Sequence, residues 1–281
     1  MCGIAGVMTA DRSVPDPDAL DTMKEALAHR GPDGDAIWVS GDTGLVHTRL
    51  AIIDLKTGDQ PLFGPGGTAL VANGEIYNYI ELREELTGSA FQTESDCEPV
   101  LHYYRDHGAD FAGWLRGMYA LAIHDPQERR LLLARDPFGI KPLYYIQSDD
   151  AFAFASEPQA LLAAGFGSRK LSERAVEELL QLQFTTGAET PYEGIRRVLP
   201  GETIVVAGGR IVDRRRQEAL PAGGPVRASE RQALERVEEA LVDSVDVHQR
   251  SDVPYAMFLS GGIDSSAILA LMARHQSKNC G

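Results

Sequence analysis

Residues 1–8 read Met1-Cys2-Gly3-Ile4-Ala5-Gly6-Val7-Met8 and place a nucleophilic side chain directly before an apolar run. The run Gly3–Met8 is typical of a buried strand, which would hold Cys2 at its tip. Removal of Met1 would leave Cys2 with both a thiol and a free α-amine. The thiol has a reference pKa of about 8.5 and the amine one of about 7.7–8.0, so the amine can accept the thiol proton. This stretch predicts an N-terminal nucleophile, although a chance cysteine near a terminus fits these residues equally well.

The composition is that of a soluble globular chain, with 281 residues, enough for one large domain or two ordinary ones. A net charge of −14 argues against a binder of nucleic acid, and the basic run Arg214–Arg216 is expected to be a solvated stretch. No apolar stretch is long enough to span a membrane, and no secretory signal is evident. Three cysteines, at positions 2, 97 and 280, form neither a disulfide framework nor a zinc pattern. We therefore expect a cytoplasmic protein without nucleic-acid or membrane partners.

Short strands and helices alternate over residues 1–206 and predict an α+β domain. Each strand candidate is apolar or alternating and is bounded by turn residues; the candidates are Gly3–Met8, Ala36–Val39, Gly44–Arg49, Thr68–Asn73, Ala120–His124, Arg130–Arg135 and Phe152–Ala155. Helical periodicity covers Pro17–Ala28, Ile76–Leu86 and Glu98–His107.

The chain then changes character. Residues 207–228 hold two Gly-Gly pairs and the arginine run, which predicts a linker between domains. Residues 229–281 form a second segment. Within it we expect a helix over Ser229–Gln249 with Ser229 as N-cap, a strand over Val253–Leu259, a turn over Ser260–Ser266 and a helix over Ala267–His275.

Five further segments follow Cys2 in a fixed order. They are His29-Arg30-Gly31-Pro32-Asp33, His47 to Asp54, Asn73-Gly74-Glu75-Ile76-Tyr77-Asn78, Ser95-Asp96-Cys97-Glu98 and Arg135 to Tyr144. With Cys2 they resemble the class II glutamine amidotransferases, whose glutaminase domain uses an N-terminal nucleophile. The resemblance covers residues 1–206 and implies a four-layer αββα sandwich of the N-terminal-nucleophile hydrolase type.

The resemblance also implies the roles of individual residues, and it needs no cofactor in the glutaminase half. Cys2 would attack the side-chain amide of glutamine, and Asn73 and Gly74 would stabilise the oxyanion. Arg49 would bind the α-carboxylate, while Asp96 and Glu75 would bind the α-ammonium. The expected glutamine site comprises Arg49, Leu50, Ile52, Ile53, Asn73, Gly74, Glu75 and Asp96. By residue type alone, Arg49 and Asp96 could form surface ion pairs and Asn73-Gly74 a hairpin turn.

Three other side chains near these motifs have alternative interpretations. His29 or His47 could form a dyad with Cys2, but we expect both to hydrogen-bond to loops instead, because the terminal amine supplies the base. Cys97 is expected to be a small buried residue rather than a second nucleophile.

The second segment contains Ser260-Gly261-Gly262-Ile263-Asp264-Ser265-Ser266 after the apolar run that ends at Leu259. A strand, a Gly-rich turn and a helix N-terminus together form an anion cradle, and no lysine follows as it would in a Walker A loop. The pattern resembles the PP-loop of ATP pyrophosphatases. It implies that Leu259, Ser260, Gly261, Gly262, Asp264, Ser265 and Ser266 bind ATP at the start of an α/β domain, with Asp264 near Mg²⁺.

A glutaminase followed by a PP-loop resembles the family of glutamine-hydrolysing asparagine synthetases. That family would use glutamine, ATP and aspartate, and it allows a homodimer. The sequence ends at Gly281, where family members run roughly twice as far, so we expect only the glutaminase half to be complete. The alternatives are a PP-loop amidotransferase that acts on a sugar or peptide carboxylate, and a non-catalytic truncation product.

Overall fold

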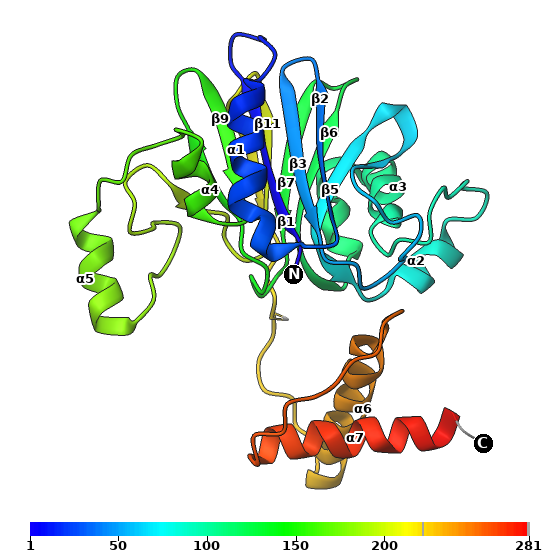
Figure 1. Ribbon diagram of the computed structural model, residues 1–281. Helices are drawn as coiled ribbons and strands as arrows, with labels where there is room; N and C mark the ends of the chain where they lie inside the picture. Colours follow the sequence, from blue (N-terminus) through cyan, green and yellow to red (C-terminus); the bar gives the residue numbers. More distant parts are fainter. Residues whose placement is uncertain (221, 280–281) are drawn as a thin grey trace. The chain divides into compact units, whose positions relative to one another are not determined.

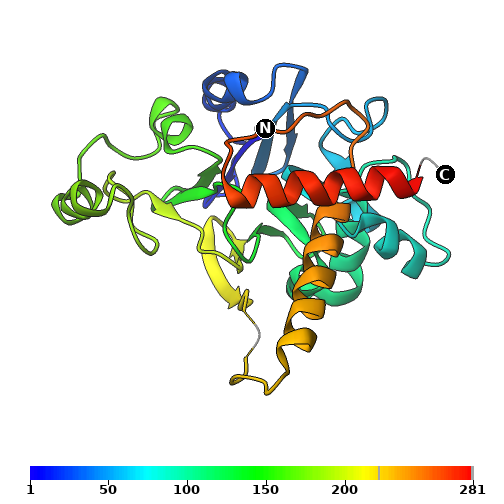
Figure 2. The same cartoon turned by 90° about the horizontal axis from the view of Figure 1, so that it is seen from below.

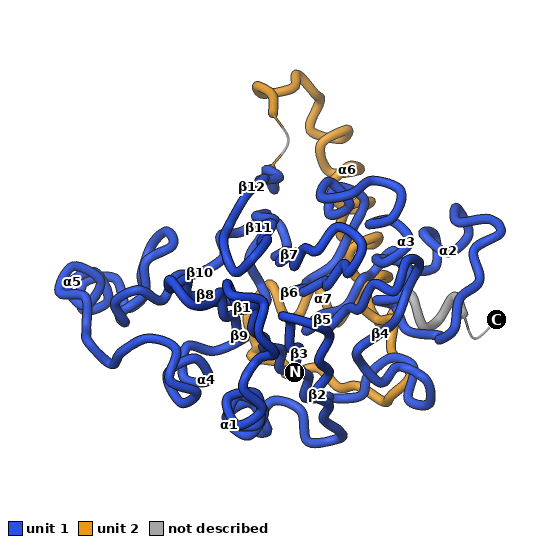
Figure 3. The backbone as a smooth tube through the Cα atoms, turned by 90° about the horizontal axis from the view of Figure 1, so that it is seen from above, with its two compact units in different colours: residues 1–219 blue, residues 220–281 orange. Residues whose placement is uncertain are grey.

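The computed structural model describes residues 1–220 and 222–279. The chain divides into two compact units, Met1–Ala219 (unit 1) and Leu220–Gly281 (unit 2), which Figure 3 distinguishes by colour. Among the described residues, no helix is both long and apolar enough to cross a membrane. Cys280 lies outside the described residues.

Unit 1 is built on two six-stranded sheets whose neighbouring strands all pair antiparallel. The first sheet has the order β10 (Arg196–Arg197), β8 (Tyr144–Gln147), β9 (Ala151–Ala155), β1 (Gly3–Thr9), β3 (Thr43–Arg49) and β2 (Gly34–Ser40). The second has the order β12 (Arg210–Arg216), β11 (Glu202–Ala207), β7 (Arg130–Arg135), β6 (Gly117–Asp125), β5 (Ala69–Ile76) and β4 (Leu62–Phe63).

Helices cover the outer face of each sheet. The first sheet packs against α1 (Pro17–Leu27) and α4 (Pro158–Ala163), and the second against α2 (Tyr79–Glu85), α3 (Glu98–His107) and the 3-10 segment η3 (Gly108–Trp114). The layers can be followed in Figure 1 and Figure 2. Unit 1 also contains α5 (Glu173–Leu182) and the 3-10 turns η1 (Ala28–Arg30) and η2 (Pro65–Gly67). The expected αββα sandwich is confirmed.

The alternation of side chains along β1 shows why these residues form a doubly covered strand. Ile4 and Met8 point into the core between the two sheets, whereas Ala5 and Val7 pack under α1 and α4. Successive side chains of a strand point to opposite faces, so an apolar run on both faces is what a strand inside a four-layer sandwich requires. Burying a side chain such as Ile4 contributes about 1.5–3 kcal/mol, and this anchors β1 with Cys2 at its start.

The end of unit 1 differs from the linker expected over residues 207–228. Arg210–Arg216 form β12, the edge strand of the second sheet, paired with β11. Arg214 is also not merely solvated, because it donates to Glu202 and, at 2.7 Å, to the hydroxyl of Tyr145. Sequence alone misses this strand because nearly all of its residues are exposed, so it lacks the apolar or alternating pattern that marks the other strands.

Unit 2 contains α6 (Glu230–His248) and α7 (Ile263–Asn279). The expected N-cap of α6 is confirmed, since Ser229 and Gln232 exchange hydrogen bonds as a capping box. The expected strand Val253–Leu259 is wrong: these residues form no strand, and Phe258 is fully exposed. The physical reason is that a strand needs a paired neighbour, and no other described segment of unit 2 is a strand.

Candidate active site

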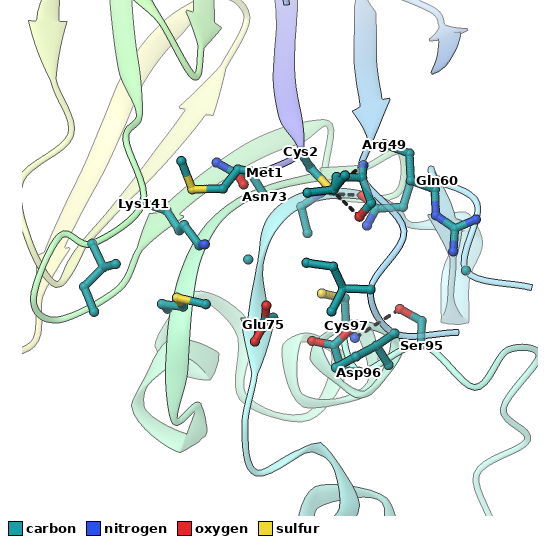
Figure 4. A pocket seen from close by; sticks show the side chains of 18 residues that line it. Met1, Cys2, Arg49, Gln60, Asn73, Glu75, Ser95, Asp96, Cys97 and Lys141 are labelled. Carbon is teal, nitrogen blue, oxygen red and sulfur yellow. Dashed lines mark hydrogen bonds between the residues drawn. The ribbon is translucent and has the colours of Figure 1, made fainter. Parts of the chain in front are cut away.

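The residues expected to bind glutamine converge on one cavity of about 400 Å³ in unit 1 (Figure 4). They come from the start of β1, the end of β3 and the loop after it, β5, and the turn before α3. The cavity is lined by Met1, Cys2, Arg49, Leu50, Ile52, Ile53, Gly58, Gln60, Ala72, Asn73, Gly74, Glu75, Ser95, Asp96, Cys97, Met118, Ile140 and Lys141. All nine residues named for the glutaminase half are therefore brought together.

Cys2 is held at the cavity wall by its neighbours on both sides. The backbone N–H of Leu50 lies 3.4 Å from Sγ and donates to it, and Sγ lies 3.6 Å from the Leu50 carbonyl. Arg30 donates from Nε to the Cys2 carbonyl at 3.0 Å and pairs with Glu157 at 2.6 Å. Burial raises the pKa of the Cys2 thiol, while the Leu50 N–H, the terminal amine of Met1, Arg49 and Lys141 act in the opposite direction. The thiol therefore needs a base and nearby cations to react near neutral pH.

Asn73 and Gly74 lie within β5, where Asn73 pairs with Ala120 and Gly74 with Tyr119. The hairpin-turn interpretation of Asn73-Gly74 is therefore wrong, because the strand continues through both residues. Gly74 has a steric reason to lack a side chain: a Cβ there would lie 2.4 Å from the Met118 carbonyl oxygen. Only glycine permits this approach of β5 to β6.

The side-chain amide of Asn73 is a buried donor without an acceptor. Asn73 is 1% exposed, and its Nδ2 has no hydrogen-bond partner among the described residues. Such a group normally costs about 1–3 kcal/mol in a folded protein, and it therefore calls for an explanation. A donor that lines a cavity beside a thiol is suited to an oxygen that becomes negatively charged only during reaction.

Arg49, at the end of β3, is buried and already engaged. Its Nη1 pairs with Asp59 and its Nη2 donates to the carbonyl of Asp54. Asp54 is in turn fixed by N–H groups of Thr57 at 2.8 Å and Glu94 at 2.9 Å. The loop therefore orients the guanidinium at the cavity wall.

The acidic end of the cavity is formed by Asp96 and Glu75. Asp96 accepts the backbone N–H of Ile76 at 2.7 Å, and burial, opposed by that bond, raises its pKa to about 6. The nearby charge of Glu75 acts in the same direction as burial. Figure 4 shows both carboxylates across the cavity from Cys2. A ligand with an ammonium at one end and a reactive carbonyl at the other would match this separation.

The structure also identifies a residue that sequence reasoning passed over. Lys141 lies in the fifth motif, whose residues were noted without any role, and its ammonium reaches the same cavity (Figure 4). Gln60 and Ser95 line the cavity as well; Gln60 accepts the N–H of Ala72 at 2.6 Å and so supports β5. The available signal was the place of Lys141 in the motif Arg135 to Tyr144, which follows the other motifs in order.

His29, His47 and Cys97, the remaining candidates, have surroundings that do not support a role as base or nucleophile. His29 lies 3.1 Å from Glu157, and His47 is buried with its pKa lowered to about 4 by burial. Cys97 is buried as expected, and burial raises its pKa well above the usual value. Neither histidine has a hydrogen bond to Cys2 among the described residues, so the structure offers no dyad.

In unit 2 the PP-loop residues form a turn that leads into α7. Ser260 Oγ lies 3.0 Å from Ser265 Oγ, and Gly261 has a φ of 78°, which glycine adopts without strain. Asp264 lies in the first turn of α7. The described residues contain no cluster of three or more His, Cys, Asp or Glu side chains that could hold a metal ion.

The comparisons with known proteins show the family of the chain. The glutamine amidotransferase domain family matches residues 1–216, and the chain belongs to this family. A second family, asparagine synthase, matches residues 236–280.

Two curated relatives extend over nearly the whole chain. Asparagine synthetase [glutamine-hydrolyzing] 1 of Bacillus subtilis (strain 168) is 39% identical over 282 residues, which are 96% of this chain and 44% of the relative. Amidase chry2 of Gibberella zeae is 33% identical over 296 residues, 97% of this chain and 43% of the relative. The chain thus spans less than half the length of each of these relatives.

A solved structure supports the fold. The glutamine phosphoribosylpyrophosphate amidotransferase of B. subtilis, complexed with ADP and GMP, superposes with a TM-score of 0.56 at 24% identity. The match covers 76% of this chain and 49% of the other. At this identity the likeness shows the sandwich architecture alone.

Proposed function

We propose that unit 1 hydrolyses glutamine through Cys2 as the N-terminal residue, after removal of Met1. The α-amine of Cys2 takes the thiol proton, and the thiolate sulfur bonds to the side-chain carbonyl carbon of glutamine. The C–N bond then breaks and ammonia leaves with the proton from the amine. Water cleaves the resulting thioester and releases glutamate. The observation that carries this proposal is the placement of a thiol and an unpartnered buried amide donor in one cavity.

The oxyanion of the tetrahedral intermediate would be stabilised by Nδ2 of Asn73 and the backbone N–H of Gly74. Arg49 would donate to the α-carboxylate from the guanidinium N–H groups that Asp59 and the Asp54 carbonyl leave available. Asp96 and Glu75 would bind the α-ammonium. Because they lie across the cavity from Cys2, glutamine can bridge the two ends with its amide at the thiol.

For the whole protein we propose asparagine synthesis from aspartate, ATP and glutamine. The asparagine synthase match over residues 236–280 and the name of the B. subtilis relative support this proposal. Ser260, Gly261 and the N-terminus of α7 would contribute to pyrophosphate binding. The described part of unit 2 contains no strand and no cluster of three or more metal-binding side chains, so no adenylation step is assigned to it.

A different acceptor is the second candidate. A relative that is not named an asparagine synthetase, Amidase chry2, is also similar over nearly the whole chain, so we retain an acceptor other than aspartate, such as a sugar or peptide carboxylate, as the second candidate. Product analysis with aspartate and with other carboxylates, in a chain that includes the remaining half of the relatives' length, separates the two.

Ammonia release from glutamine tests the glutaminase proposal. Cys2→Ala should release no ammonia above background while its thermal unfolding matches that of the unchanged protein. Cys97→Ala is the matched control, because it removes the other described thiol, and it should retain most of the activity. Near-normal release by Cys2→Ala would overturn the assignment.

A further inference from the structure

Lys141 is a nearly buried cation that the proposed reaction has not used. Lys141 is 5% exposed. Among residues 1–220 and 222–279, its ammonium has no hydrogen-bond or ion-pair partner. It lines the same cavity as Cys2, and Figure 4 shows its Nζ directed into the cavity between Met1 and Glu75. Burial lowers the pKa of Lys141, while the negative charges around it oppose this effect. Desolvating an ammonium without a direct partner is unfavourable, so a role in the cavity offers an explanation.

The loop that carries Lys141 is built to hold this position. The carboxylate of Asp136, fully buried, accepts the N–H of Ile140 at 2.9 Å and that of Lys141 at 3.0 Å. Arg135 donates to the carbonyls of Gly139 at 2.6 Å and Lys141 at 2.7 Å. The carboxylate of Asp136 thus binds N–H groups of the loop, and the guanidinium of Arg135 binds its carbonyl groups. These charge-assisted hydrogen bonds hold the loop backbone in place, so the side chain of Lys141 extends from a rigid base.

The charges that face Lys141 come from three sides of the cavity. Glu75 on β5, Cys2 at the start of β1 and Asp136 in its own loop attract its charge, whereas Arg30 on η1 repels it. The cations that act on the Cys2 thiol are the terminal amine, which Met1 carries in this structure, Arg49 and Lys141. Arg49 pairs with Asp59 and donates to the Asp54 carbonyl, whereas Lys141 is a buried side-chain cation whose charge no direct contact neutralises among the described residues.

We infer that Lys141 is a positioning residue of the glutaminase reaction: its ammonium stabilises the thiolate of Cys2 as the thiol loses its proton. This inference rests on the proposed function. The proton passes from Sγ to the α-amine, and the sulfur lone pair then forms the S–C bond with glutamine. Lys141 gives up and takes up no proton; it acts on the charge that the sulfur carries between the two events.

The pH dependence of Cys2 alkylation by iodoacetamide tests this inference without requiring turnover. The modified Cys2 peptide is quantified by mass spectrometry in the unchanged protein, in Lys141→Met and in Lys141→Arg. The matched control is Lys170→Met, which removes an exposed lysine paired with Glu193.

Lys141→Met should move the alkylation midpoint up by about one pH unit, which is a tenfold loss of thiolate below the midpoint. Because a more basic thiolate is more nucleophilic, the rate at neutral pH should fall by only about three- to fourfold. Lys141→Arg should keep a midpoint near that of the unchanged protein, and Lys170→Met should not shift it.

An unshifted midpoint in Lys141→Met, or equal shifts in Lys141→Met and Lys141→Arg, would overturn the inference. If Lys141→Met does not fold, Lys141→Gln serves for the same measurement. Failure here is distinct from failure of the proposed function, which would show instead as ammonia release by Cys2→Ala.

Discussion

Replacing Asn73 by alanine separates catalysis from stability more sharply than any other change in this site. The Asn73 amide is 1% exposed, and its Nδ2 lacks an acceptor among the described residues. In the free protein the substitution therefore removes an unsatisfied donor, whose burial costs about 1–3 kcal/mol, and loses part of a side chain that borders a cavity. These effects oppose each other, so we expect the free energy of unfolding to change by less than about 1 kcal/mol.

The catalytic effect should be much larger. If Nδ2 donates to the oxyanion, its loss should lower kcat by about 10²- to 10³-fold, which corresponds to about 2.7–4 kcal/mol of transition-state stabilisation. KM should change little, because the donor acts on charge that develops after glutamine has bound. Steady-state ammonia release and urea unfolding measure the two quantities on the same preparation.

Asn78→Ala is the matched control for this experiment. Asn78 donates to the Trp114 carbonyl at 2.9 Å and accepts the N–H of Arg116 at 2.9 Å, so both ends of its amide are partnered. Its removal should destabilise unit 1 by about 1 kcal/mol and leave kcat nearly unchanged. The reasoning is refuted if Asn73→Ala keeps kcat within threefold of the unchanged protein, or if it loses as much stability as Asn78→Ala.

Four other predictions follow from the same geometry. Arg49→Lys keeps the charge but loses the guanidinium fork, so KM for glutamine should rise more than tenfold with a smaller change in kcat; an unchanged KM would remove Arg49 from carboxylate binding. The pKa of Asp96 is raised to about 6, so its charged form is lost below that pH. We expect kcat/KM to fall about tenfold per pH unit in that range, and Asp96→Asn should not show this decrease. The raised pKa also means that ionised Asp96 destabilises the fold: Asp96→Asn should be the more stable variant above pH 6, and urea unfolding should show this advantage disappearing below pH 4. Residues 1–219, expressed without unit 2, should retain glutaminase activity, and loss of ammonia release would show that unit 2 supports unit 1.

The sequence predicts the fold of unit 1 well because most of its strands are buried, and a buried strand appears in the sequence as a short apolar run. The observed β7 and α3 match the expected bounds Arg130–Arg135 and Glu98–His107. The exposed edge strand Arg210–Arg216 was missed, since a basic strand with one free side resembles a linker. The apolar run Val253–Leu259 was predicted as a strand from composition, but a strand also depends on a partner that no single segment supplies.

The sequence predicted those site residues whose side chains have a known chemical role. It did not predict the features of the site that depend on how distant segments pack. Cys2, Arg49 and Asp96 could be named by residue type and resemblance, and the structure places them around one cavity. The clash of a Cβ at Gly74 with Met118, and the burial of Lys141, arise from segments far apart in the sequence. Periodicity and composition contain no information on such contacts, which only the packed sheets create.

Cys2 is proposed to react as the N-terminal residue, and covalent labelling of the nucleophile tests this. The protein is inactivated with a glutamine analogue that carries a diazoketone in place of the side-chain amide, and the labelled peptide is mapped by mass spectrometry. We predict one adduct, on the Cys2 thiol, in a peptide that begins at Cys2 with a free α-amine and lacks Met1. A label on Cys97, or a labelled peptide that still carries Met1, would contradict it.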